Sequence, residues 1–373
     1  MTTLAPYRAD HVGSLLRPQY LLKARESFRD GKISAAALRT EENRAISEIV
    51  KFQEDIGLKG ITDGEFRRTY FHVDFLEKIK GVKTSGGIQV SFKRKDGNID
   101  FSPPVMRVTG KLRHVSPIQL HDFEYLHSVI TKPSTAKVCI PSPSMLHFRG
   151  GRNAISREAY PTLEPEFYDD VAECYRAEIK SLANAGCTYL QLDDTNLAYL
   201  CDPKMREGAK SRGDDPNELP LRYARLINSA IAEKPEGMRI CIHLCRGNFR
   251  SGWAAEGDYE PVAEVLFNEL NVDGYFLEYD DERSGSFRPL RHVPKKKQIV
   301  LGIISTKIEK IENESDIKRR IDEAAVYVPM EQLSLSPQCG FSSTVHGNDI
   351  AYINQKKKLE LVVKIANDVW GHH

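Results

Sequence analysis

Short apolar runs bounded by Gly, Pro or Asp alternate along this chain with longer amphipathic segments. Runs of this kind predict buried β-strands, and a repeat of three to four residues predicts helices. The strand pattern occurs at residues 9–14, 58–63, 136–141, 188–193, 238–243, 273–278, 298–303 and 332–337. The helical pattern occurs at residues 36–56, 165–185, 316–328 and 352–370.

Strands that alternate with helices predict a parallel sheet whose strands are joined by crossovers. Eight such units are typical of a (β/α)8 TIM barrel, and an open doubly wound sheet is the alternative. The first strand runs into Val12-Gly13-Ser14, which lacks the glycines of the dinucleotide fingerprint that such an open sheet often carries. We therefore expect an α/β fold, a (β/α)8 TIM barrel that forms one catalytic domain over residues 1–373.

The alternation is interrupted between the second and third predicted strands. Residues 87–92 and 105–108 are rich in β-formers, and Asp96-Gly97 between them is typical of a tight hairpin turn. We expect a β-hairpin inserted into the barrel over about residues 87–112.

The amino-acid composition bears on which kinds of binding partner we expect. Lys and Arg number 53 and Asp and Glu 52, so the net charge of +1 gives no sign of nucleic acid or a membrane surface as partner. The first residues do not resemble a signal peptide, and no apolar stretch has the length of a membrane span. Seven cysteines, an odd number, are typical of a reducing compartment. We expect a cytoplasmic protein.

Candidate chemistry gathers where the predicted strands end, which is where a barrel of this kind builds its site. His243 ends the fifth strand with Cys245 two residues on, Glu278 ends the sixth, and Cys339 follows the eighth. A lone His at a strand end is more often a hydrogen-bonded core residue. However, His, thiolate and carboxylate are all zinc ligands, and side chains two apart on a strand point the same way. The convergence of all four predicts one zinc site.

Further carboxylates end the second and fourth strands. Glu65 follows the second strand, and the adjacent Asp193 and Asp194 end the fourth. Neighbouring side chains on a strand point to opposite faces, so we expect one aspartate to face the barrel axis and the other to cap the next helix.

The motifs His243-Leu244-Cys245, Glu278 and Cys339-Gly340, in this order, resemble the catalytic barrel of the cobalamin-independent methionine synthase family. The resemblance runs from residue 8 to 371 and is greatest to the short, single-barrel branch labelled methionine synthase II-like. It implies a zinc-dependent methyltransferase that acts on the thiol of homocysteine and forms methionine. It also implies a homocysteine pocket in which Ser14 lies at the carboxylate and Glu65 and Asp193 bind the amine.

The half of the family site that handles the methyl donor differs here. Residues 302–307 hold no counterpart of the family His that follows the seventh strand, and residues 140–145 hold no counterpart of its Trp. Lys307 and His147 are candidates for the missing proton donor, whereas Arg149 and Arg152 are candidates to meet an anionic donor tail. We expect a donor of the folate or corrinoid type, and one other than long-chain polyglutamyl folate unless that folate binds weakly.

Two other functions remain open at this point. A zinc-dependent alkyl transfer to another thiol, such as coenzyme M, would use the same metal chemistry. Because a sulfonate thiol has no amine, Glu65 and Asp193 favour an amino-acid thiol. A non-catalytic zinc-binding barrel is the second alternative, since structural zinc sites also have four protein ligands.

Overall fold

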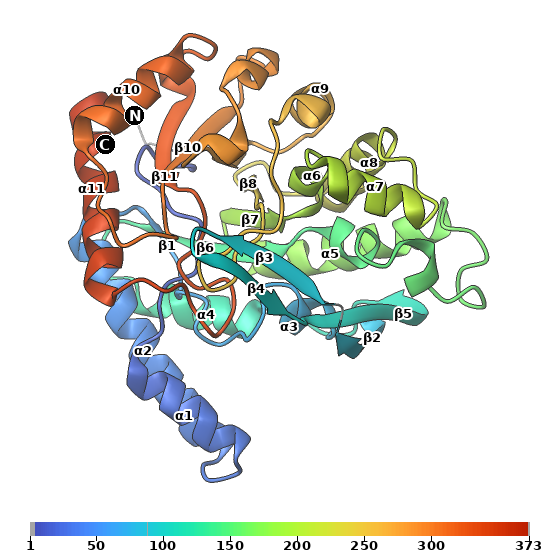
Figure 1. The fold of residues 1–373 in the computed structure, drawn as a ribbon. Coiled ribbons are helices and arrows are strands. Elements are labelled where there is room, and N and C mark those ends of the chain that lie inside the picture. The colour runs from blue at the N-terminus through green and yellow to red at the C-terminus, as the bar shows by residue number, and fades with distance from the viewer. Residues whose placement is uncertain (1–3, 88, 372–373) are drawn as a thin grey trace.

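A parallel sheet curls around a central axis in the computed structural model, which describes residues 4–87 and 89–371 (Figure 1). Its strands lie in the order β1-β6-β7-β8-β9-β10-β11, and every neighbouring pair is parallel. These strands are β1 (Gly60–Ile61), β6 (Thr135–Pro141), β7 (Tyr189–Asp194), β8 (Arg239–Leu244), β9 (Gly274–Glu278), β10 (Gln298–Ile304) and β11 (Leu333–Pro337). Seven of the eight predicted strands are thereby confirmed, most to within two residues.

The predicted first strand is only a single parallel bridge, between Ala9 and Leu335 of β11. On its other side, the imidazole Nε2 of His11 lies 3.1 Å from the carbonyl oxygen of Gly60 in β1. The segment is too irregular for a strand because the Asp10 carboxylate accepts hydrogen bonds from the backbone of Tyr7 and His11. It still lies between β11 and β1, so it closes the sheet into a (β/α)8 barrel.

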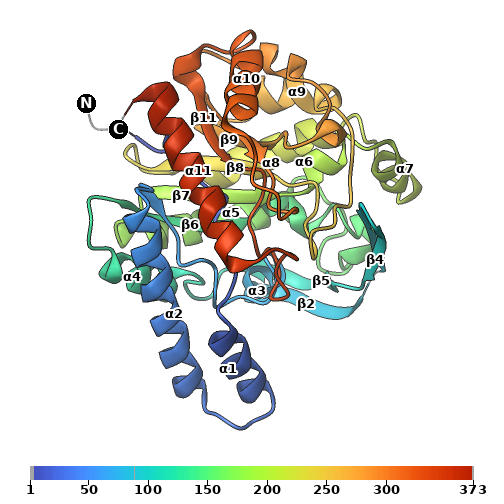
Figure 2. The same cartoon turned by 60° about the vertical axis from the view of Figure 1, so that its left-hand side comes forward.

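Helices cover the outside of the barrel (Figure 2). The four predicted helices are confirmed as α2, α5, α10 and α11, although α10 ends at Ala325, short of the predicted residue 328. The α-helices are α1 (Gln19–Arg29), α2 (Ala35–Asp55), α3 (Val73–Leu76), α4 (Leu120–Val129), α5 (Glu166–Asn184), α6 (Asn196–Tyr199), α7 (Pro203–Ser211), α8 (Leu219–Ile231), α9 (Glu260–Asn268), α10 (Glu314–Ala325) and α11 (Tyr352–Trp370). Short 3-10 turns are η1 (Pro143–Leu146), η2 (Gly151–Ala154), η3 (Glu282–Ser284), η4 (Arg288–His292) and η5 (Met330–Gln332).

The inserted hairpin lies where it was predicted but is longer, because it begins at residue 80. It consists of two nested antiparallel pairs, β2 (Lys80–Gly87) with β5 (Pro104–Arg113), and β3 (Val90–Arg94) with β4 (Gly97–Phe101). Ser102 and Pro103 lie between β4 and β5, and Pro103 has no backbone N–H with which to continue the ladder of β4.

The tip of the hairpin is fixed to the rim of the barrel mouth (Figure 1). Lys93 exchanges two backbone hydrogen bonds with Trp253, of 2.7 and 3.0 Å, in the loop that follows β8. Arg94 forms an ion pair of 2.7 Å with Asp349 in the loop that precedes α11. The hairpin therefore lies across the end of the barrel where the strands stop.

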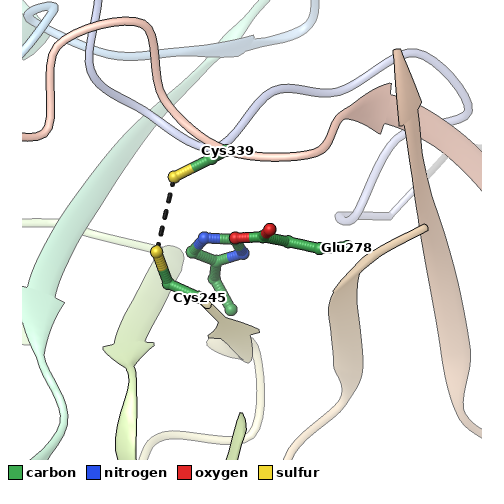
Figure 3. Close-up of side chains that lie close together, drawn as sticks. Cys245, Glu278 and Cys339 are labelled. Atoms are coloured by element: carbon green, nitrogen blue, oxygen red, sulfur yellow. Dashed lines mark hydrogen bonds between the residues drawn. The ribbon is translucent and has the colours of Figure 1, made fainter. Parts of the chain in front are cut away.

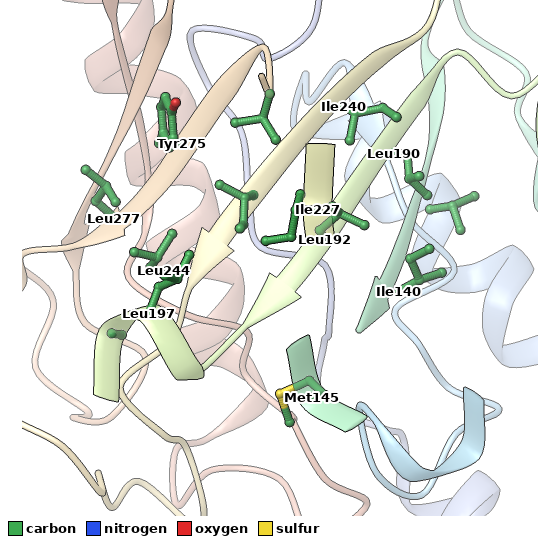
Figure 4. Packing of buried hydrophobic residues seen from close by; sticks show 14 of the residues in the cluster. Ile140, Met145, Leu190, Leu192, Leu197, Ile227, Ile240, Leu244, Tyr275 and Leu277 are labelled. Carbon is green, nitrogen blue, oxygen red and sulfur yellow. The ribbon is translucent and has the colours of Figure 1, made fainter. Parts of the chain in front are cut away.

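Two apolar layers hold the barrel together. The larger lies between the strands and the surrounding helices, where Leu190, Leu192 and Ile240 are fully buried (Figure 4). A smaller cluster fills the barrel interior below the strand ends and is made of Ala5, Val12, Tyr189, Cys241, Phe276 and Val300. This plug fills the barrel interior, so the strand ends that carry the candidate ligands lie above it, at the C-terminal end where barrels of this kind build their sites. Within the described residues, no helix has the length and apolarity of a membrane span.

Candidate metal centre and thiol pocket

The ends of β8, its neighbour β9, and β11 bring the four predicted metal ligands together at the barrel axis. His243 lies on β8 and Cys245 one residue beyond it, Glu278 ends β9, and Cys339 lies two residues after β11. Their ligand atoms all lie within 4.8 Å of one another, and the four side chains are buried. The Sγ atoms of Cys245 and Cys339 are 3.5 Å apart (Figure 3).

This donor set fits a zinc ion. Thiolates at about 2.3 Å from a tetrahedral zinc lie roughly 3.8 Å from each other, close to the separation found here. Neither ring nitrogen of the buried His243 has a nitrogen or oxygen hydrogen-bond partner among the described residues, and the thiol of Cys339 lies beside the imidazole. Buried imidazoles are rarely left unpaired, and a metal ion would engage one of these nitrogens. The hydrogen bond from Cys245 also holds the pKa of Cys339 well below its usual range, which favours a thiolate.

Two arginines flank the Glu278 carboxylate. The backbone N–H of Arg246 donates to Oε1 at 3.0 Å, and Nη2 of Arg283 lies 3.3 Å from Oε2. The fully buried guanidinium of Arg246 packs over the ring of Tyr259, 4.3 Å from its centroid. These contacts fix the Glu278 carboxylate and offset its negative charge. Arg283 was not predicted, because its approach to Glu278 depends on the turn of the loop that follows β9.

The predicted amine-binding carboxylates lie beside the metal cluster. Gln191 donates to Oδ1 of Asp193 at 2.7 Å. Asp194 points the other way, as predicted, where its Oδ1 accepts the N–H of Leu197 at 2.8 Å and so stabilises the start of α6. Glu65 approaches from the loop after β1, and Gly13 packs against it so closely that an added Cβ would lie 2.3 Å from Oε1. Only glycine therefore allows the turn that carries Ser14 to approach Glu65.

Arg68 lies between the two carboxylates, a position that no local pattern in the sequence predicts. Its guanidinium forms an ion pair with Glu65, and Nη1 lies 3.9 Å from Oδ2 of Asp193. The two carboxylates therefore share one cation, and their role as amine ligands stays a prediction.

A cavity opens above these groups, and its floor includes Ser14, Glu65, Asp193 and three residues of the metal cluster, His243, Cys245 and Cys339. Its walls are largely aromatic, and the inserted hairpin contributes part of them. The ring of Phe101 from β4 stacks on Phe249 with centroids 4.0 Å apart. The aromatic lining residues are Tyr70, Phe71, His72, Phe92, Phe101, Phe148, Tyr199 and Phe249. Phe148, in the loop that follows β6, is one of these rings.

Comparisons with known proteins agree with this geometry. A family model described as "Cobalamin-independent synthase, Catalytic domain" matches residues 9–367. The chain belongs to the cobalamin-independent methionine synthase family. It is 47% identical over 370 residues to the uncharacterized protein YxjH of Bacillus subtilis, covering 98% of this chain and 95% of that protein.

More distant and structural relatives extend the family assignment. A protein named methionine synthase from Pyrococcus horikoshii is 27% identical, with coverage of 95% of this chain and 92% of that protein. The crystal structure of a putative vitamin-B12 independent methionine synthase from Listeria monocytogenes superimposes with a TM-score of 0.79 at 41% identity, over 99% of this chain and all of that one.

The family member described here places its two candidate proton donors behind the cavity wall. His147 donates to or accepts from the Tyr223 hydroxyl at 2.9 Å, and burial together with nearby arginines lowers its pKa to about 4. Nζ of Lys307 donates to Oδ1 of Asn248 at 2.9 Å. Neither belongs to the described residues that line the cavity. Arg149 does line it, whereas Arg152 donates to backbone carbonyls such as that of Ile155.

Proposed function

We propose that the protein transfers a methyl group to the thiol of homocysteine and forms methionine, using one zinc ion bound by His243, Cys245, Glu278 and Cys339. The observation that carries the proposal is the buried four-ligand cluster, three of whose residues line a cavity beside paired carboxylates. Membership of the family, and the name of the relative from Pyrococcus horikoshii, support the same reaction.

Each part of the site has a role in this reaction. When bound, zinc supplies the positive charge that keeps the substrate sulfur as a thiolate, which is the nucleophilic form. Glu65 and Asp193 bind the substrate ammonium, and the turn at Ser14 lies at its carboxylate. The aromatic walls exclude water from the thiolate and provide apolar surface for the donor. The chain itself thus binds, orients and desolvates the two substrates.

The first test is zinc content. The purified protein should hold about one zinc per chain, and Cys339→Ser should hold much less, because a neutral hydroxyl replaces a thiolate ligand. Cys241→Ala is the matched control. Cys241 lies on the same strand as His243 but in the apolar plug, so this variant should keep its zinc. Elemental analysis of the three proteins gives the comparison.

The second test is the reaction itself. Zinc-loaded protein, homocysteine and either methyltetrahydrofolate or methylcobalamin should give methionine, measured by mass spectrometry. Full zinc content in Cys339→Ser with unchanged methionine formation contradicts the ligand assignment. A zinc-loaded protein that methylates homocysteine from neither donor contradicts the activity.

A further inference from the structure

A guanidinium lies between Glu65 and Asp193, the two carboxylates proposed to bind the ammonium of the acceptor. Arg68 forms an ion pair with Glu65, lies 3.9 Å from Asp193, and its side chain is 14% exposed. Apart from this ion pair with Arg68, neither carboxylate oxygen of Glu65 accepts a hydrogen bond from any described residue. The guanidinium therefore neutralises part of the charge that the substrate ammonium would otherwise meet.

The neighbouring Arg67, in the same loop, has contacts that serve only to stabilise the fold. It forms ion pairs of 3.5 Å with Glu42 and 3.0 Å with Asp122, and its guanidinium packs over the ring of Tyr125. These partners join the loop to α2 and α4. Arg68, in contrast, lines the cavity that contains the metal cluster, and both its carboxylate partners are proposed substrate ligands.

A zwitterionic amino acid can exchange with this ion pair without leaving a charge unpaired. Its ammonium takes the place of the guanidinium at Glu65 and Asp193, and the freed guanidinium can pair with its carboxylate. The turn at Ser14 lies beside Glu65, so both carboxylate-binding groups are close to the same point. A thiol with only one of the two charges would leave either Arg68 or the carboxylates without a partner, which is unfavourable inside a protein.

We propose that Arg68 is a specificity-determining residue of the acceptor site, which selects thiols that carry both an ammonium and a carboxylate. Before the acceptor binds, Arg68 holds the place of the ammonium. Once the acceptor binds, it pairs with the α-carboxylate, because guanidinium matches carboxylate geometry with two parallel hydrogen bonds. This inference rests on the proposed methyl transfer to homocysteine and concerns only how the acceptor is chosen.

The test compares thiols that differ in one charge at a time. Homocysteine carries both charges, γ-aminopropanethiol lacks the carboxylate, and γ-mercaptobutyrate lacks the ammonium. Affinities for zinc-loaded wild type, Arg68→Met and the matched control Arg67→Met are measured by isothermal titration calorimetry, with thermal unfolding to confirm that each variant folds. Arg68→Lys keeps the charge, and Arg68→Gln provides a second neutral variant should Arg68→Met fail to fold.

The affinities for homocysteine and for γ-aminopropanethiol should change in opposite directions in Arg68→Met. Arg68→Met should weaken homocysteine binding by roughly tenfold or more, since a charged hydrogen-bond partner of the carboxylate is lost. The same change should strengthen the binding of γ-aminopropanethiol, because its ammonium no longer competes with a guanidinium. Arg68→Lys should keep most of the preference for homocysteine, and Arg67→Met should leave all relative affinities unchanged.

Two results would overturn the inference, and they separate it from the proposed function. If Arg68→Met shifts both thiols by the same factor and in the same direction, Arg68 has a structural part only, while methylation of homocysteine by the wild type stands. If zinc-loaded wild type binds homocysteine no better than γ-mercaptobutyrate, the acceptor assignment itself is wrong.

Discussion

At the scale of single residues, Glu65 combines a proposed ligand role with an unfavourable backbone. Its φ of 57° lies in the left-handed region that residues with a side chain rarely adopt. Asp63 accepts the N–H of Glu65 at 2.8 Å, and Nη2 of Arg17 donates to its carbonyl at 2.6 Å. Strain of this kind persists only when its surroundings fix it, and it often marks functional sites. The loop therefore holds the carboxylate in place before the substrate arrives.

Removal of that carboxylate should affect amino-acid thiols selectively. Glu65→Gln keeps the shape and deletes the charge, and loss of one partner of a buried charge pair typically costs about 2–5 kcal/mol. Homocysteine affinity, measured by calorimetry on zinc-loaded protein, should fall sharply, whereas affinity for an uncharged alkyl thiol should hardly change. Equal losses for the two thiols would show that Glu65 does not bind the ammonium.

His147 offers a prediction about pH. Its folded pKa is about 4, below the ordinary value of 6.5, so the unfolded chain binds a proton that the folded protein does not. The stability that the neutral imidazole provides is present above about pH 6.5 and is lost as the pH falls toward 4. His147→Gln should therefore be less stable than wild type at about pH 8, and the gap should narrow by about 2 kcal/mol at about pH 5.

Denaturant unfolding of the two proteins at both pH values measures this change. His147→Gln should also keep its methyl transfer rate near neutral pH, because a neutral imidazole behind the cavity wall does not protonate the donor. A large loss of turnover, with the loss following a titration near neutrality, would instead support His147 as the acid.

At the scale of elements, the sequence located the barrel strands well because each is a short apolar run with clear boundaries. Strands β6 to β11 of the barrel lie within two residues of their predicted ends. The prediction of the first strand was wrong because the Asp10 carboxylate accepts the backbone N–H groups of Tyr7 and His11. In a strand these groups would be free to pair with neighbouring strands. The start of the hairpin was missed because residues 80–87 are polar and rich in glycine, and only pairing with β5 makes them a strand.

Changes in the inserted hairpin should alter the KM for the methyl donor and leave the KM for homocysteine unchanged. Phe101 of β4 stacks on Phe249 in the upper wall of the cavity, whereas the thiol pocket lies on the floor. Phe101→Ala removes apolar and aromatic contacts, which should raise KM for the methyl donor severalfold, since such a ring pair contributes about 0.5–1.5 kcal/mol beyond its buried area. Steady-state kinetics with each substrate varied in turn provides the measurement.

Lys95→Ala, at the exposed turn of the same hairpin, is the control and should leave both KM values unchanged. An equal rise in KM for donor and homocysteine in Phe101→Ala would mean that the hairpin stabilises the whole mouth and does not contact the donor in particular.

At the scale of the whole molecule, the sequence identified those site residues that follow directly from strand ends. His243, Glu278 and Asp193 lie on strands, and their convergence follows from the barrel alone. Arg68 and Arg283 reach the site through irregular loops, so their positions depend on contacts that no local pattern records. The aromatic walls combine the hairpin with loops from distant parts of the chain, and only the folded barrel brings them together.

The charges around the cavity bear on the identity of the methyl donor. Lys204, Arg149 and Arg212 line its upper part, and within the described lining the only carboxylates are Glu65 and Asp193 on the floor. Arg149 forms no ion pair among the described residues, and its one hydrogen bond, of 3.2 Å, is to Nε2 of His72. Cations and aromatic rings together favour a planar donor with an anionic tail and disfavour a sulfonium, which would bring a further positive charge.

A panel of donors at fixed homocysteine concentration tests this expectation. Methyltetrahydrofolate with one glutamate should serve as a donor, and a sulfonium donor should be much slower. A triglutamate tail should improve KM by less than about tenfold, because exposed ion pairs contribute only about 0.2–1 kcal/mol each. Arg149→Gln should weaken the folate and leave methylcobalamin unaffected, since the charged tail is the group that Arg149 would meet. If a sulfonium is the fastest donor, or if the triglutamate form is preferred more than about a hundredfold, the cations at the mouth do not select the donor in this way.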